Sequence, residues 1–363
     1  MRGKGVRAAT AVAVACIALL AALACGGCRS EASHAKASED GPVAVVLVHT
    51  KSGSELDVVD LSTMRLARRV KLRSLCLEIA ADARTRTVVT AQCGGPDRSA
   101  DDAAGIYRIG ERKVRYVELG IPNPLDVATA GGVALLVHGF ERSGRLVTTR
   151  MDVATQHVLG HGSLGPGALA PLAWRDGFIV PEIDVASDPL ACSLVAMDRD
   201  GRASALGSLD ARRAALVAPE AGAAGPPRLI LSRASEPGSD ASWSLARLGA
   251  SGIESEAPIS ALQYGVADAC MWGELLAVAD ADGVDMSDPG DTLWVFDPGT
   301  GEQKLALRIA GGMPAAVASW QGRLLVADGV SGDLLEYASD GRLRSRLKLG
   351  GAPVGSAALV VVP

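Results

Sequence analysis

Residues 313–352 alternate between apolar and polar positions in four short runs, which are separated by turn residues. The runs read PAAVAS, RLLVAD, DLLEYA and RLRSRLKL, and the breaks between them read WQG, GVSG and SDG. Gly, Asp and Ser at such breaks are typical of tight turns between β-strands. The pattern predicts a four-stranded antiparallel unit. A single unit of this kind cannot bury both of its faces, so copies of it should stack on one another.

Six more copies are found by aligning the turn between the third and fourth strands. The aligned positions are Asp60, Ile109, Asp152, Asp198, Leu248, Asp297 and Ala338. Residues 42–363 make 322 residues, and one seventh of this is 46, a spacing expected of four-stranded propeller blades. The sequence therefore predicts an all-β fold, a seven-bladed β-propeller of antiparallel blades.

The two ends of the repeat region are out of phase with the units. The run VAVVLVH after Pro42 matches a second strand, and the terminal APVGSAALVVVP resembles a surplus first strand. We expect residues 355–362 to form the innermost strand of the first blade, which would close the ring and remove an open sheet edge. Three Trp residues at matching first turns, Trp174, Trp272 and Trp320, are expected to cover apolar surface between blades, with each indole N–H bound to a carbonyl or water.

The first 24 residues have the pattern of an export signal. A basic MRGKGVR precedes the apolar run AATAVAVACIALLAALA. The run ends at ALAC, so Cys25 resembles the lipidated first residue of a bacterial lipoprotein; cleavage by the ordinary signal peptidase and retention as an anchor are the alternatives. Residues 25–41 are expected to be a disordered tether. These features predict an exported protein at the cell envelope, lipid-anchored at the outer face of the membrane or secreted.

Composition narrows the classes of partner. The chain has 363 residues, with 48% hydrophobic and only 3% aromatic residues, and a formal charge of −5. Loss of the signal removes three positive charges and leaves about −8, which argues against nucleic acid and anionic membrane surfaces as partners. We expect a monomer that binds an unknown protein or a small molecule outside the cytoplasm.

Two segments carry a resemblance to known propellers. The run VVLVHTKSGSELDVVDLSTMRLARRVKL resembles a repeat of the YVTN (YncE-like) class of bacterial β-propellers. The segment ELLAVADADGVDMSDPGDTLWVFDPGTGEQKLALRI is similar to the penultimate blade of quinoprotein amine dehydrogenase heavy chains. The resemblance implies a seven-bladed ring for residues 42–363. It transfers no catalytic residue, because in those dehydrogenases the quinone sits on a separate small subunit.

Two cysteines flank the first hairpin of the second unit. Cys76 and Cys93 are centred on the turn at residues 83–86, which places them opposite each other on antiparallel strands and predicts a disulfide in an oxidising compartment. The alternative is two small buried side chains. The spacing leaves open whether Cys192 and Cys270 meet.

Every second strand ends in a polar residue in the same register. These residues are His49, Gln92, His138, Glu182, Arg233, Asp280 and Asp328. Superposable units should place them on one face around the mouth of the central channel, where they could bind a cation or a polar small molecule. The alternative is that strand ends are polar because they meet water.

An acidic loop in the sixth unit is a second candidate site. Asp280, Asp282 and Asp285 lie in DADGVDMSDPGD, where clustered carboxylates resemble a calcium loop without the EF-hand order. A solvated acidic loop is the alternative. No cofactor is required by the sequence; a divalent cation such as calcium would be the candidate.

No catalytic constellation is found in the sequence. His157 and His161 are four residues apart, about 13 Å along a strand, which is too far for both to bind one metal ion. We therefore favour a non-catalytic binding or scaffold domain. The alternatives are an enzyme, either a propeller lactonase or hydrolase or the heavy subunit of a quinoprotein-type dehydrogenase, and a purely structural envelope module.

Overall fold

The computed structural model describes residues 37–363, except 51–52, 95–100, 141–145, 166–169, 185–190, 210, 212, 218–219, 221–226, 233–242, 250–251, 261, 282–289 and 350–357. Residues 1–36, which include the predicted signal and Cys25, are a separate unit and lie outside the described residues. Residues 37–363 form the second unit. Within the described residues, no helix has the length and apolar character needed to span a membrane.

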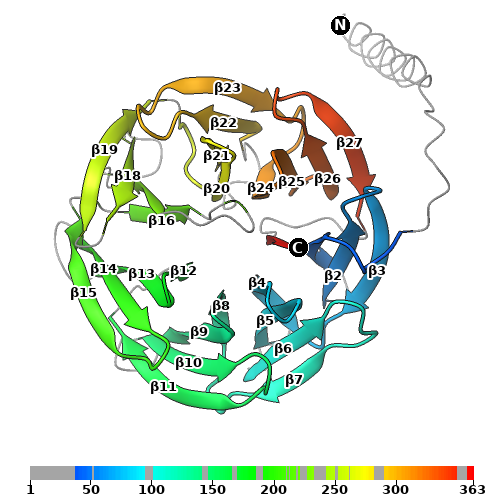
Figure 1. Cartoon of the computed structure of the whole chain (residues 1–363), viewed down its shortest axis with the longest axis vertical. Coiled ribbons are helices and arrows are strands. Elements are labelled where there is room, and N and C mark those ends of the chain that lie inside the picture. The colour runs from blue at the N-terminus through cyan, green and yellow to red at the C-terminus, as the bar shows by residue number, and fades with distance from the viewer. Residues whose placement is uncertain are drawn as a thin grey trace, which may run out of the picture. The chain divides into compact units, whose positions relative to one another are not determined.

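The described strands form seven four-stranded antiparallel sheets that stand as blades around a central axis (Figure 1). Blade A contains β28 (Leu359–Val362), β1 (Val43–Thr50), β2 (Gly53–Asp60) and β3 (Arg65–Lys71). Blade B contains β4 (Leu75–Asp82), β5 (Thr87–Gly94), β6 (Ala103–Arg108) and β7 (Arg115–Glu118). Blade C contains β8 (Pro124–Ala130), β9 (Val133–Phe140), β10 (Leu146–Asp152) and β11 (Val158–Leu164). The predicted seven-bladed fold is confirmed.

The other four blades repeat this order. Blade D contains β12 (Leu172–Trp174), β13 (Gly177–Asp184), β14 (Ala191–Asp198) and β15 (Ala203–Leu209). Blade E contains β16 (Arg213–Val217), β17 (Arg228–Ser232), β18 (Trp243–Leu248) and β19 (Ile253–Ile259). Blade F contains β20 (Asp268–Trp272), β21 (Leu275–Asp280), β22 (Thr292–Phe296) and β23 (Gln303–Arg308). Blade G contains β24 (Pro314–Trp320), β25 (Arg323–Asp328), β26 (Asp333–Tyr337) and β27 (Leu343–Lys348).

The ring closes through blade A, as the sequence predicts. The C-terminal strand β28 pairs antiparallel with β1, and Val43 stands opposite Val362. The described strand covers Leu359–Val362, and residues 355–357 of the predicted run lie outside the described residues. The two ends of the chain therefore share one sheet, and β1 has no free edge.

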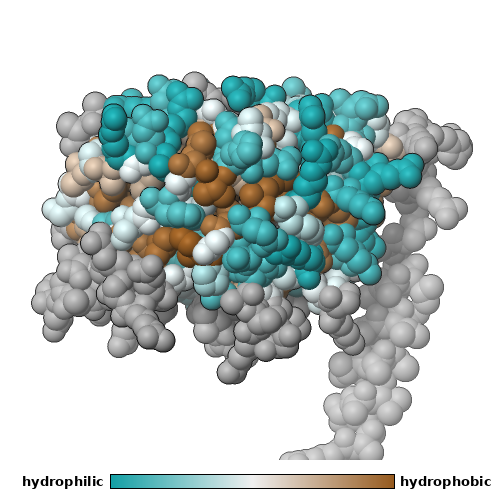
Figure 2. Space-filling view, turned by 90° about the horizontal axis from the view of Figure 1, so that it is seen from below, coloured by the Kyte–Doolittle hydropathy of each residue, from teal (hydrophilic) through white to brown (hydrophobic). Residues whose placement is uncertain are grey.

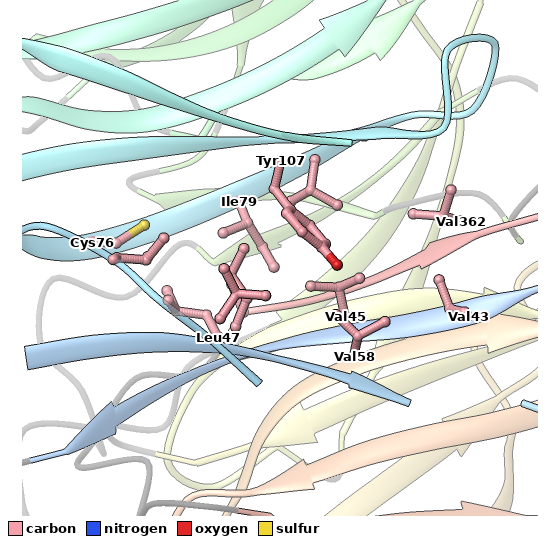
Figure 3. Close-up of a cluster of buried hydrophobic side chains, with 13 residues drawn as sticks. Val43, Val45, Leu47, Val58, Cys76, Ile79, Tyr107 and Val362 are labelled. Carbon is pink, nitrogen blue, oxygen red and sulfur yellow. The ribbon is translucent and has the colours of Figure 1, made fainter. Parts of the chain in front are cut away.

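The core lies between neighbouring blades. In Figure 3, Val43, Val45, Leu47 and Val58 of blade A meet Cys76, Ile79 and Tyr107 of blade B, and Val362 of β28 completes the cluster. Second strands such as β21 and β25 are buried on both faces, whereas outer strands such as β23 and β27 alternate between exposed and half-buried positions. On the side of the ring seen in Figure 2, hydrophilic side chains surround a band of hydrophobic ones. Val, Leu and Ala make up most of these clusters.

The turns between third and fourth strands repeat one hydrogen-bond pattern. Asp60 accepts from the Ser62 backbone N–H (2.8 Å), Asp152 from that of Thr155 (2.7 Å) and Asp297 from that of Gly299 (2.8 Å). An Asp side chain that bonds to backbone two or three residues ahead stabilises such turns. This explains why the turns aligned so well in the sequence.

The Trp residues cover the contacts between blades. The indole N–H of Trp272 in blade F donates to the Gly322 carbonyl of blade G (2.9 Å), as predicted. The guanidinium groups of Arg175 and Arg323 stack over the rings of Trp174 and Trp320, at 4.2 and 4.7 Å from the ring centres.

The predicted Cys76–Cys93 disulfide is wrong, because both cysteines are free. Two register shifts in the β4–β5 ladder, on either side of Cys76, place this residue opposite Gln92 instead of Cys93. The thiol of Cys76 contacts the Glu78 carbonyl, and that of Cys93 contacts the Leu75 carbonyl. A one-residue slip turns a side chain to the other face of a sheet, and this separates the two sulfur atoms. Cys192 and Cys270 are also free.

Candidate functional site

Five of the polar residues at the ends of the second strands bind the connection that enters their own blade. We call this connection, from the fourth strand of one blade to the first strand of the next, the entry connection. We call the five residues that bind it the loop-holding side chains. They are Gln92, His138, Glu182, Asp280 and Asp328.

Asp280 at the end of β21 shows the arrangement most completely. Its carboxylate accepts the backbone N–H groups of Gln263, Tyr264 and Gly265 at 2.8–2.9 Å, and the indole N–H of Trp294 at 2.9 Å. The residue is only 2% exposed. Both carboxylate oxygens are thus engaged by hydrogen-bond donors, which leaves no free lone pair directed at a metal ion.

Asp328 repeats this arrangement one blade later. It accepts the backbone N–H groups of Met313 (2.9 Å), Val330 (3.0 Å) and Ser331 (3.3 Å), and the hydroxyl of Ser331 (2.5 Å). The residue is 1% exposed. Met313 belongs to the entry connection of blade G, so the carboxylate ties that connection to the loop after β25.

Gln92 and His138 do the same with neutral groups, and both have no exposed surface. The Ser74 hydroxyl donates to Oε1 of Gln92 (2.9 Å). Nδ1 of His138 lies 3.1 Å from the Pro122 carbonyl, which can only accept, so this nitrogen carries the proton. Burial lowers the pKa of His138 and keeps its ring neutral.

The remaining members of the predicted ring are less uniform. Oε1 of the half-buried Glu182 accepts the Gly165 N–H at 2.7 Å. Nδ1 of His49 lies 3.0 Å from the Ser54 hydroxyl, and burial lowers the pKa of His49. Ser54 is only 2% exposed, so this Ser–His pair is closed to a substrate. Arg233 lies outside the described residues.

The predicted ring is therefore a set of internal hydrogen bonds. Its members share one register, as expected, but four of them are 2% exposed or less, and they bond to their own entry connections. These four side chains are not exposed around the channel mouth, as a binding ring would require, and they are not polar because they meet water. The entry connection folds over each strand end and needs a polar partner there.

The acidic loop adds no described metal site. Asp280 is the residue just discussed, and Asp282 and Asp285 lie outside the described residues. Elsewhere in the described part, one set of three acidic side chains, Asp101, Asp102 and Glu118, brings its oxygens within 4.8 Å of one another. The guanidinium of Arg73 already pairs with Asp101 (2.5 Å) and Glu118 (2.9 Å).

His161 takes part in a short chain of hydrogen bonds across blade C. Its Nδ1 lies 3.1 Å from the hydroxyl of Thr149, which lies 2.8 Å from Nε2 of His138. Because Nε2 of His138 must accept, Thr149 donates to it and accepts from His161. None of these three side chains belongs to the described lining of the central cavity, so the hydrogen-bond chain is part of the blade.

The strongest candidate site is the central channel. A cavity of about 680 Å³ is lined by the first strands of the blades, mainly by Ala, Val and Leu side chains. Its described lining contains three charged residues, Glu78, Asp126 and Asp268, and no Lys, Arg or His. We call these three the channel carboxylates. A cavity of this size with a few polar groups on apolar walls is typical of a small-molecule site.

Bulges in the first strands position two of the channel carboxylates. Leu77 has no partner in the β4–β5 ladder, and Glu78 follows it opposite Ala91. Leu125 has none in the β8–β9 ladder, and Asp126 follows it opposite Val137. Asp268 takes the same place at the start of β20, opposite Ala279. Bulges commonly turn a side chain toward a functional site.

The channel carboxylates lie on two walls of the channel. Blades B and C are neighbours, through contacts between β4 and β8, and blade F stands across the ring with two blades between it and either of them. Figure 1 shows β4 and β8 on one side of the central opening and β20 on the other. Since their oxygens are absent from the compact set named above, they do not form a preformed three-ligand metal centre.

Each channel carboxylate is held by a local backbone bond. The N–H groups of Ile79, Val127 and Ala269 donate to Glu78 (2.9 Å), Asp126 (2.7 Å) and Asp268 (2.8 Å). The Val317 N–H also donates to Asp268 (2.8 Å). These bonds fix the carboxyl groups against the wall and leave Glu78 and Asp126 with an oxygen for a ligand.

Burial raises the pKa of all three channel carboxylates. The pKa of Asp126 rises to about 7 and that of Asp268 to about 6, with burial as the main cause. Burial also raises the pKa of Glu78 well above its usual value, and repulsion from Asp126 and Asp268 adds to the effect. Strongly perturbed carboxyls in a cavity mark a candidate functional site.

Sequence reasoning missed these residues, although a signal was present. The first strands read L-E-I-A at Glu78, L-D-V-A at Asp126 and A-D-A-C at Asp268, so three of seven repeats carry an acid at one position. This position lies in the first strands, away from the turns and second-strand ends that define the repeat.

Comparisons with known proteins show the fold alone. No protein-family model matches the chain, and no curated protein matches it. A functionally unknown protein from Desulfotomaculum acetoxidans is 11% identical, with a TM-score of 0.62, over 87% of this chain and 98% of that one. Kuenenia stuttgartiensis hydrazine synthase gives 12% identity and a TM-score of 0.59 over 87% and 100% of the two chains.

A third similar structure differs in its closure. The β-propeller domain of the Trilobed protease from Pyrococcus furiosus, described as having an open velcro topology, is 10% identical with a TM-score of 0.56, over 84% of this chain and 91% of that one. In the chain described here β28 closes blade A. The neighbours include enzymes and proteins of unknown function, and at this identity they carry no site residue across.

Proposed function

We propose that this protein is a binding propeller whose central channel takes a small aliphatic ligand with two or more ammonium groups, such as a diamine or polyamine. One observation carries the proposal. Glu78 and Asp126 on one wall and Asp268 on the other are the charged groups of the described lining of a cavity of about 680 Å³. Ammonium groups at the two ends of a linear ligand would pair with both walls.

The apolar lining between the carboxylates supports an aliphatic spacer. Ala80, Ala128, Ala269 and Val317 are among the wall residues, and methylene groups can pack against them without losing hydrogen bonds. A single divalent cation is supported less, because its ligands must converge within one coordination sphere. The separated carboxylates fit separated charges better.

The cellular setting of the proposal rests on the sequence. The basic and apolar residues before Cys25 support export and an N-terminal lipid anchor at the outer face of the membrane. The VVD-containing repeat supports membership of the YVTN-like class. We propose a non-catalytic role in binding, since the channel carboxylates hold a charged ligand without needing a nucleophile.

A thermal-shift series tests the proposal directly. Putrescine and spermidine should raise the melting temperature, whereas n-butylamine, with a single ammonium group, and calcium chloride should have little effect. The double variant Glu78→Gln/Asp268→Asn should lose the shift, because each charge-assisted pair contributes a tenfold or larger share of affinity, about 1.5–3 kcal/mol.

The matched control is Asp340→Asn, which removes an exposed carboxylate far from the channel lining. It should respond to putrescine as the wild type does. Equal shifts for butylamine and putrescine, or an undiminished shift in the double variant, would refute the diamine site.

A further inference from the structure

Residues 38–41 are docked on the ring, although the sequence predicts a disordered tether over 25–41. The side chain of Glu39 is only 8% exposed. One of its oxygens accepts the Tyr107 hydroxyl (2.9 Å) and the Gly110 N–H (2.8 Å), and the other pairs with Arg68. We call residues 38–41 the strap.

The backbone of the strap is held as firmly as its side chain. The guanidinium of Arg86 donates to three successive carbonyls, those of Glu39 (2.9 Å), Asp40 (2.9 Å) and Gly41 (2.6 Å). The Ser38 N–H donates to Asp60 (3.0 Å). A disordered tether would not form the Glu39–Arg68 ion pair or the bonds from Arg86 to three successive carbonyls. These contacts therefore indicate a docking site for residues 38–41 on the ring.

All contacts of the strap lie on one face of the ring. Asp60 ends β2, Gly110 follows β6, and Arg86 is in the turn between β4 and β5. These turns join first to second strands and third to fourth strands, so in an antiparallel blade they share one face. The channel carboxylates lie toward the opposite face, near the ends of the second strands.

We propose that the strap fixes the exit point at which the N-terminal segment leaves the ring, next to Ala37, on the face opposite the carboxylate end of the channel. Only the use of that end by a ligand rests on the proposed function; the exit point itself does not.

Energy transfer within the full chain tests the exit point without any ligand. A donor dye is attached at Ala35 through an incorporated unnatural residue, within about 7 Å of Ala37 by chain length. An acceptor is attached either at Ser339 or at Val330. Both sites are exposed and lie on blade G, at opposite ends of β26.

We expect higher transfer efficiency to Ser339, on the face of the strap, than to Val330. Glu39→Ala/Arg86→Ala should abolish the difference, and Asp200→Ala, which removes an exposed carboxylate outside the strap, should preserve it. If the alanine pair fails to fold, Glu39→Gln, which keeps the side-chain shape, should reduce the difference. Equal transfer to both sites in the unaltered strap, or higher transfer to Val330, would overturn the proposal. A failure of putrescine binding would leave this result unaffected.

Discussion

Asp280 and Asp268 stand on neighbouring strands of blade F, but they have opposite surroundings. Asp280 is covered by the entry connection, and its oxygens accept four N–H donors. Asp268 lines the central cavity, where burial raises its pKa to about 6. A carboxylate that accepts four donors beneath a covering connection stabilises the fold. Asp268 accepts only two backbone N–H groups, one on each oxygen, and it borders a cavity, so each oxygen keeps a lone pair for a ligand.

The same contrast separates the two sets of residues as a whole. The loop-holding side chains occur in five blades and serve a need that every blade has, because every entry connection must satisfy its backbone polar groups. The channel carboxylates occur in three blades, where the fold alone does not require them. We infer that a feature repeated around the ring reports on architecture, and one confined to a few blades reports on function.

The largest expected effect comes from removing one of the loop-holding side chains. Asp280→Ala should lower the free energy of unfolding by about 4 kcal/mol, because it leaves buried N–H donors without an acceptor. Urea unfolding followed by circular dichroism measures the change. The exposed Asp200→Ala should change it by less than about 0.5 kcal/mol. Similar values for the two variants would contradict the structural role of Asp280.

A smaller gain in stability is expected when one of the channel carboxylates is replaced by an amide. The folded protein keeps a proton on Asp126 up to about pH 7, whereas the unfolded chain loses it near pH 4. The stability from this group is therefore complete below about pH 4 and is lost as the pH rises toward 7. Relative to wild type, Asp126→Asn should gain about 2 kcal/mol between about pH 4 and pH 8. This is about half of what a shift of roughly three pKa units gives in full, because solvent partly screens the half-buried side chain. Urea unfolding across this range, with Asp340→Asn as control, measures the gain; a constant difference would contradict the raised pKa.

The smallest effect sharpens the comparison within the loop-holding set. Glu182 accepts a single backbone N–H and is half-buried. Glu182→Ala should therefore cost only about 1 kcal/mol, and Glu182→Gln, which keeps an acceptor oxygen, about half of that. Thermal unfolding of the two variants side by side gives both values. A loss as large as that of Asp280→Ala would show that the number of donors does not set the cost.

Much of the fold could be predicted from the sequence, because its signals are local. The Asp residues of the outer turns, such as Asp60 and Asp297, set the repeat spacing, and the phase of the two chain ends predicted the closure by β28. The site could not be predicted in the same way. Whether a strand-end polar residue such as His138 is exposed depends on how the preceding connection folds over it, and this is a tertiary property.

Bulges explain two more differences between the prediction and the structure, namely the free Cys76 and Cys93 and the unpredicted channel carboxylates. The register shifts beside Cys76 separate it from Cys93, and the shift at Leu77 turns Glu78 toward the channel. A bulge adds one residue to one strand and leaves little mark in a sequence of Val, Leu and Ala. Counting residues from a turn therefore predicts the strands themselves, but not which side chains stand opposite each other beyond a bulge.

Proton release on ligand binding tests the central claim most directly. Because burial raises the pKa of Asp126 to about 7, a bound ammonium group should favour the ionised carboxylate and expel a proton near neutral pH. Isothermal titration of putrescine near pH 7, in two buffers with different ionisation enthalpies, measures this release. We predict a buffer-dependent heat for wild type and none for Glu78→Gln/Asp126→Asn. Putrescine binding without proton release, or no binding by the wild type, would contradict the account.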